Sequence, residues 1–234
     1  MFKNIFYPTT QNVFIWLGAI YLLFLLYIGK ASPIIILFAY FLETIIIGLF
    51  TTLKMLWSIV FGKSKGFSLL LIFTIHYGFF VAIQSIFGFA LFSIENTSVI
   101  KEPFHILQNY GIIINLEGIQ YAFPAIFLNH IGKFISDFLH HKKYLVFSAK
   151  DLMFKPYVRI FIQQFVVIIS FFFIVFTNIG FVSAILLVLF RLIVDLSLES
   201  IKKNSKTLDA LAQILANKKV SIEEIKKQLI LFTE

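Results

Sequence analysis

The chain has 234 residues, of which 59% are hydrophobic and only 14% are charged, and its formal net charge is +8. This composition excludes an ordinary soluble domain and indicates a membrane protein, because runs of 18 or more apolar residues can cross the hydrocarbon core. The absence of cysteine excludes disulfides and metal sites built on thiolates. Backbone in lipid must satisfy its own hydrogen bonds, and the apolar runs lack the alternation of a barrel, so we expect an all-α protein.

Six apolar segments predict six transmembrane helices. They cover residues 12–28, 32–61, 67–94, 119–139, 156–176 and 180–198. The second segment begins at Ser32-Pro33, which is typical of an N-cap followed by proline at the first helical position. A polar loop containing a short helix is expected from Glu95 to Glu117, and Pro124 is expected to kink the fourth span.

Lysine is distributed unevenly between the two sets of connections. One set carries Lys3, Lys63, Lys65, Lys142, Lys143, Lys150, Lys155 and a lysine-rich tail. The other set carries Lys30 and Lys101, with three glutamates beside the latter. The positive-inside rule therefore predicts a multi-pass protein of the cytoplasmic membrane with both termini in the cytoplasm. Lysine next to spans attracts anionic lipid, so we expect membrane lipid and not nucleic acid as the partner of this charge.

The last 34 residues differ in kind from the six-span domain of residues 1–200. Residues 201–234 predict a cytoplasmic tail of two amphipathic helices. The first helix is expected to begin at Ser205, with Leu208, Leu211 and Leu215 on one face; the second opens with a capping box from Ser221 to Glu224 and places Ile222, Ile225 and Leu229 together. Such short helices need a packing partner, which is either the other helix of the tail or another subunit.

Polar groups inside the predicted spans are the candidate functional residues. A charge at the middle of a membrane helix costs ~2.5–3.5 kcal/mol on insertion scales, so it normally faces protein or water. The candidates are Glu43, Lys54, His76, His130, Lys133, Asp137, Arg159, Gln164, Arg191 and Asp195.

Two spans carry opposite charges one turn apart. Lys133 and Asp137 share a face of the fourth span with His130, and Arg191 and Asp195 are adjacent on the sixth. One interpretation is that these pairs simply neutralise each other near the inner interface. Alternatively Asp137 and Arg191, together with Glu43 and Lys54, line a partly hydrated cavity on a route for a solute or proton.

Glu43 and Lys54 lie on one face of the second span but ~16 Å apart along its axis, since each residue rises 1.5 Å. They are too far apart to pair. Each therefore needs a partner from another span, or Glu43 must be protonated, because desolvation favours the neutral carboxyl group.

His76 and His130 are predicted at a common depth of ~15 Å from the cytoplasmic end of their spans. One interpretation is that each ring binds a local carbonyl. Alternatively the two histidines with Glu43 offer a ligand set for zinc or non-haem iron, or hold a haem in a slot lined by Gln84. A metal or haem cofactor therefore stays open at this point.

No catalytic motif is recognisable, including the nucleophile elbow, the His-Glu-x-x-His helix, the Walker loop and the dinucleotide fingerprint. The sequence therefore does not predict an enzyme class. The leading hypothesis is a non-catalytic component or anchor of a membrane assembly, acting as a homo-oligomer or with other membrane subunits. The alternatives are a solute or proton pathway and the histidine-based metal or haem site.

Several short motifs together resemble an uncharacterised bacterial family of multi-pass membrane proteins, a domain of unknown function, over residues 11–200. The motifs are Ser32-Pro33, Leu42-Glu43, Lys54-Met55, Ile75-His76-Tyr77-Gly78, Asn129-His130, Pro156-Tyr157-Val158-Arg159 and Leu192-Ile193-Val194-Asp195. The resemblance implies histidines at the positions of Gln84 and Gln164, so any metal held through them would be lost in this chain. The tail weakly resembles a short C-terminal two-helix domain, which implies oligomerisation.

Overall fold

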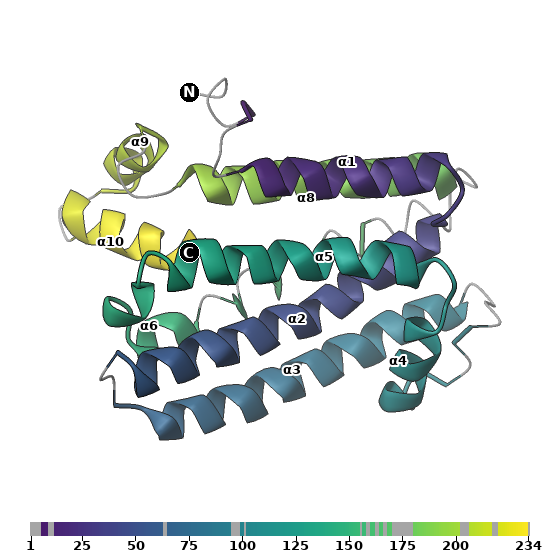
Figure 1. Cartoon of the computed structure of the whole chain (residues 1–234), viewed down its shortest axis with the longest axis horizontal. Helices are drawn as coiled ribbons and strands as arrows, with labels where there is room; N and C mark the ends of the chain where they lie inside the picture. The colour runs from purple at the N-terminus through teal and green to yellow at the C-terminus, as the bar shows by residue number, and fades with distance from the viewer. Residues whose placement is uncertain are drawn as a thin grey trace.

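The computed structural model places most of the chain in a bundle of helices that lie roughly along one axis (Figure 1). It describes residues 6–8, 12–62, 65–94, 99–100, 102–154, 156–157, 160–161, 164–165, 168–169, 180–201, 206–216 and 220–233. The described helices agree with the all-α prediction.

The first three helices form where the long apolar runs predict them. They are α1 (Val13–Tyr27), α2 (Pro33–Val60) and α3 (Phe67–Ile94). The Ser32 hydroxyl accepts a hydrogen bond from the backbone N–H of Ile35 at 3.3 Å, which confirms the predicted N-cap. Gly29 has a φ of +71°, a left-handed conformation that glycine adopts without strain, and it reverses the chain between α1 and α2.

The middle of the chain contains one short helix and one long one. These are α4 (Ile106–Ile114), inside the predicted polar loop, and α5 (Ile119–Lys133), which continues as a π-helical turn from Phe134 to Leu139. The His140 N–H closes this turn on the carbonyl of Ile135 at 2.9 Å. A 3₁₀ turn (Lys143–Leu145) and α6 (Ala149–Met153) follow.

The last part of the chain forms α8 (Gly180–Ser200), α9 (Lys206–Leu215) and α10 (Ile222–Thr233). The Ser221 hydroxyl accepts a hydrogen bond from the Glu224 N–H at 3.3 Å, as the capping motif predicts. The predicted fifth span lies largely outside the described residues, and so does Ser205.

Helix α2 is the centre of the bundle. It packs against α3, α5, α6 and α8, while α1 packs against α5 and α8. In their most apolar stretches, 78% of α2 but only 33% of α3 is buried, so α2 is internal and α3 is peripheral. The connections between α1 and α2 and between α3 and α5 lie at one end of the bundle, and α6, α9 and α10 lie at the other (Figure 1).

Two described helices, α2 and the stretch of α3 from Phe67 to Ala90, are long and apolar enough to cross a membrane. A third candidate arises if α4 and residues 119–139, which meet at a bend of 101°, count as one broken span. With 15 residues, α1 is about 22 Å long, shorter than a typical hydrocarbon core. The structure thus supports two to three membrane spans by this criterion, and the count of six stays a prediction.

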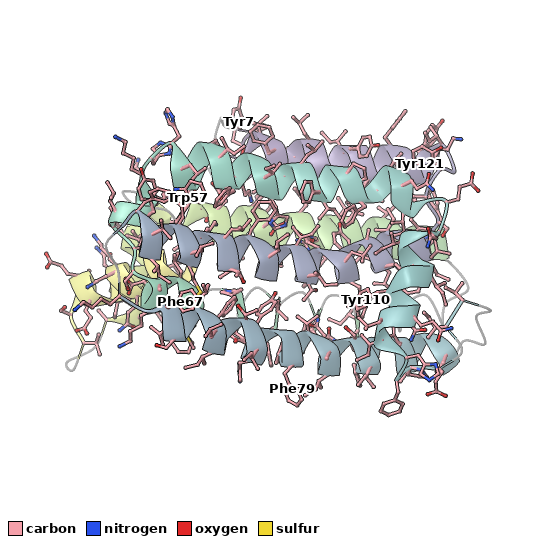
Figure 2. The ribbon with its side chains drawn as sticks, turned by 60° about the horizontal axis from the view of Figure 1, so that its bottom comes forward. Tyr7, Trp57, Phe67, Phe79, Tyr110 and Tyr121 are labelled. Carbon is pink, nitrogen blue, oxygen red and sulfur yellow. The ribbon has the colours of Figure 1, made fainter. Side chains whose placement is uncertain are left out.

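The outer face of α3 suits contact with lipid. Leu71, Ile75, Phe79 and Ile83, spaced by four residues, are each more than half exposed. Figure 2 shows Phe79 pointing away from the bundle. Trp57 and Tyr121 lie towards opposite ends of the bundle (Figure 2), as aromatic residues at the two membrane interfaces do.

Candidate functional site

Glu43 joins three helices at the middle of the bundle. Its side chain is 2% exposed, and its Oε1 atom accepts a hydrogen bond from His130 Nε2 of α5 at 2.7 Å. The same oxygen accepts a hydrogen bond from Arg191 Nη2 of α8. Glu43 thus has partners from two other helices, which is one of the two alternatives that its place in an apolar span left open.

Arg191 connects Glu43 to two further side chains. Its Nε lies 3.4 Å from the Asp195 carboxylate one turn along α8, as the spacing predicts. Its guanidinium carbon lies 4.5 Å from the centre of the Tyr40 ring, a cation–π contact. We call Tyr40, Glu43, His130, Arg191 and Asp195 the Glu43 cluster.

One member of the Glu43 cluster decides its net charge. Arg191 is always cationic, and ionised Glu43 and Asp195 carry two negative charges. Because a carboxylate only accepts hydrogen bonds, His130 donates through Nε2, and Nδ1 is the ring nitrogen that takes up a second proton. Protonation of His130 therefore changes the sum of these charges from −1 to zero.

A small, partly open cavity lies beside the cluster, between α1, α2, α5 and α8. It offers about 40 Å³ to the centres of water-sized molecules, enough for water because one water needs ~10–15 Å³ on this measure. Glu43, Arg191 and Asp195 line it, together with Gly18 of α1 and Asn129 of α5. The buried Oδ1 atom of Asn129 has no hydrogen-bond partner within the part of the chain that is described.

Aromatic rings cover the other side of His130. The Phe50 ring stacks on the imidazole with centroids 6.2 Å apart and an interplanar angle of 20°. Phe50 in turn contacts Phe134 at 5.6 Å, and Phe134 meets Trp57 edge-on at 6.2 Å. These rings, which we call the aromatic ladder, fill the α2–α5 seam from His130 towards the Trp57 end of the bundle.

The remaining charged candidates on α2 and α5 lie away from Glu43. Lys54 Nζ is 5.7 Å from the centre of the Phe138 ring. Asp137, in the π-helical turn, accepts a hydrogen bond from Lys143 Nζ at 3.0 Å. Lys133 is half-buried at the end of α5. Lys54 and Asp137 therefore have partners at the Trp57 end of the bundle.

A second polar row joins α3 to the segment that follows α6. His76 Nδ1 lies 2.8 Å from the Tyr157 hydroxyl, and Gln84 Nε2 donates a hydrogen bond to Gln164 Oε1. His76 is exposed, whereas Gln84 is buried. Arg159 lies outside the described residues.

The ligand set of Glu43, His76 and His130 is not assembled. Among the described residues, no three His, Cys, Asp or Glu side chains are grouped to hold a metal ion. Glu43 and His130 meet, whereas His76 contacts Tyr157. A common depth along two helices sets the height of a residue but leaves the rotation of each helix about its axis open, so it does not by itself bring two side chains together.

The sequence reasoning did not single out Tyr40, Gly18 or the Asn129 side chain as members of a site. Tyr40 precedes Glu43 by three residues and so shares its helix face, which is a usable signal. Gly18-Ala19 is a small-residue pair in an otherwise bulky helix, but nothing in the sequence indicates that it faces a cavity.

A family of unknown function, DUF6498, matches residues 1–213 of the chain. The chain belongs to DUF6498. The match includes every residue of the Glu43 cluster and extends beyond the range of 11–200 expected from the motifs. Neither a curated protein nor a solved structure gives a significant match. Any function for this DUF6498 member must therefore be argued from its own site.

Proposed function

We propose that this DUF6498 member is a multi-pass protein of the cytoplasmic membrane in which the Glu43 cluster is the proton-binding site of a solute or proton pathway. The observation that carries the proposal is the position of Glu43, a buried carboxylate shared by a permanent cation and a titratable ring beside a water-sized cavity. Ionisable groups inside a membrane protein commonly mark such routes.

The composition of the cluster favours proton binding over simple neutralisation. Arg191 and Asp195 alone would cancel each other's charge. Glu43 adds a second carboxylate, and His130 adds an imidazole ring, which can carry one or two protons. Uptake of a proton at His130 then brings the net charge of the cluster to zero. Release of that proton leaves one negative charge, which attracts the next proton.

The size of the cavity limits the solute. A space of about 40 Å³ for molecular centres accommodates a few waters, but not a bulky organic molecule without rearrangement. Protons carried by water fit this space, and they match the charge of the cluster with neutral His130.

The direct test is proton flux through the purified protein in vesicles that enclose a pH-sensitive dye. After a pH gradient is imposed, we expect wild-type vesicles to dissipate it faster than protein-free vesicles. Glu43→Gln should reduce the rate to the protein-free level, because an amide carries no negative charge to balance a protonated His130. Glu102→Gln, which changes an exposed carboxylate before α4, should leave the rate unchanged. No flux through the wild-type protein would contradict the proposal.

A second candidate function, a component of a membrane assembly, is supported by the tail. Helices α9 and α10 contact each other, and Lys226 Nζ lies 2.6 Å from Asp209. Around the turn between them, Ile214, Leu215 and Ile222 are 74%, 52% and 43% exposed. Such side chains in water favour a further contact, either with another copy or with another membrane subunit.

Removal of the tail tests this second function. If the tail is an assembly contact, a chain ending at residue 203 should lose the mass of an oligomer or of a co-purifying subunit in native mass measurements after gentle extraction. Ile214→Ser with Leu215→Ser should act in the same direction. Leu107→Ser is the control, because Leu107 is 88% exposed but lies on α4 at the opposite end of the bundle. A monomeric wild-type protein without partners would exclude this role.

A further inference from the structure

We propose that the Gly18 face of α1 is the wall of a hydrated access route to Glu43, and that the absence of a side chain at Gly18 sets the size of solute that reaches the cluster. The inference deepens the proposed function and rests on it, since it names water-borne protons as what the route admits. The evidence for the route is separate from the evidence for the proton-binding site, because the route concerns α1, which contributes no charged group to the cavity.

Helix α1 presents one narrow face to the cavity. Ile15, Gly18, Ala19 and Leu22, spaced by three and four residues, all line it. None of them titrates.

Every titratable or charged group around the cavity therefore comes from another helix. Tyr40 and Glu43 belong to α2, and Arg191 and Asp195 belong to α8. His130 of α5 reaches the site through Glu43. The α1 wall can thus change the space without changing the charge.

Gly18 is not explained by close packing or by backbone conformation. A Cβ atom added there meets no atom of the described residues within 4 Å, and its φ is not positive. By contrast, a Cβ at Gly48 or Gly88 would overlap the ring of Tyr77 or Phe41. Glycine in a helix interior is less favourable than alanine, so a glycine without a packing reason points to the open space itself.

The packing around Glu43 leaves the side next to α1 as the way by which water reaches its carboxylate. The aromatic ladder of Phe50, Phe134 and Trp57 fills the seam beyond His130. On the cavity side, the Asn129 Oδ1 atom is an acceptor without a hydrogen-bond partner among the described residues. A water molecule in the cavity would supply the missing donor.

Thiol labelling tests the route directly, because the chain has no cysteine and each introduced thiol is unique. A small charged methanethiosulfonate reacts with ionised thiols in water. We expect Gly18→Cys and Ala19→Cys to react in membranes, and Gly78→Cys to stay largely unlabelled. Gly78 is the matched control: an added Cβ there also meets no atom of the described residues within 4 Å, but α3 does not line the cavity. Equal labelling of all three positions would overturn the route.

Proton flux supplies the second measurement. Gly18→Leu should lower the flux towards the protein-free rate by filling the cavity, whereas Gly78→Leu should leave it at the wild-type rate. Wild-type flux in Gly18→Leu would overturn the inference alone. Absent flux in the wild-type protein with selective labelling at Gly18 would overturn the proposed function and keep the hydrated route, so the two failures are distinguishable.

Discussion

Glu43 depends on side chains that lie far from it in the sequence. Arg191 and His130 reach it from α8 and α5, and Asp195 holds the far side of the guanidinium. Desolvated charges are costly, and a cluster of this kind is stable only while its members compensate one another. The cost of losing one member therefore exceeds the cost of losing an ion pair in water.

At the residue scale, we expect Arg191→Gln to lower the free energy of unfolding by about 3–5 kcal/mol, the range for removing one partner of a buried pair. Lys226→Ala, which removes the half-exposed Lys226–Asp209 pair, should cost less than ~1 kcal/mol. Denaturant unfolding in detergent measures both. The double variant Glu43→Gln/Arg191→Gln should recover part of the loss. Equal costs for Arg191→Gln and Lys226→Ala would contradict this account of the cluster.

The sequence predicted the members of the cluster better than their contacts. Glu43, His130, Arg191 and Asp195 stand out because charges and histidines are rare in apolar runs. The spacing of Arg191 and Asp195 also predicts their contact, since residues four apart are neighbours on a helix. The bridge from Glu43 to two other helices depends on how each helix is rotated about its axis, which sequence spacing does not determine.

At the scale of helices, α2 and α3 approach closely where glycine meets an aromatic ring. Gly48 of α2 lies against Tyr77 of α3, and Gly88 of α3 lies against Phe41 of α2. The Tyr77 hydroxyl also donates a hydrogen bond to the carbonyl of Thr44 at 2.7 Å. Each helix therefore contributes one glycine, against which an aromatic ring of the other helix packs.

Gly48→Ala and Gly88→Ala should each destabilise the protein by about 1–3 kcal/mol, because the new methyl group forces a buried ring to move. Gly78→Ala, on the same α3, should be neutral or stabilising by ~0.5–1 kcal/mol, since its Cβ meets open space and alanine favours the helix. Thermal unfolding in detergent compares the three variants. A loss at Gly78 as large as at Gly48 would contradict this close packing.

The ends of the helices were more predictable from the sequence than the hydrogen-bond pattern inside them. The starts of α2 and α3 and both ends of the 119–139 helix agree with the sequence prediction, because long apolar runs end at polar or N-cap residues. The π-helical turn at Phe134–Leu139 was not predicted, since a shift to i→i+5 bonding leaves no distinctive residue pattern. The tail helices form, but Leu215 and Ile222 of the predicted apolar faces are exposed.

At the scale of the whole molecule, the lysines of the connecting segments are divided unequally between the two ends of the bundle. Lys142, Lys143 and Lys150 follow α5 at the end that also holds α9 and α10, whereas Lys30 lies at the other end, between α1 and α2. The positive-inside rule predicts that the end with α9 and α10 faces the cytoplasm, and this orientation stays a prediction.

Reporter fusions test that orientation. An enzyme reporter that is active only after export should be active when fused at Lys101 and inactive at Glu234, and a reporter that fluoresces only in the cytoplasm should give the opposite pattern. Export follows the lysine-poor side of the membrane. Activity of the exported reporter at Glu234 would overturn the predicted topology.

The long separation in sequence between Glu43 and Arg191, 148 residues, has a consequence for biogenesis. At a synthesis rate of ~5–20 residues per second, Arg191 emerges about 7–30 s after Glu43. His130 is made earlier, because it is only 87 residues away. During insertion, α2 therefore meets the ring of α5 before the guanidinium of α8. Helix α8 thus supplies the hydrogen bond from Arg191 to Glu43 last, and a nascent chain halted before Arg191 would lack that donor.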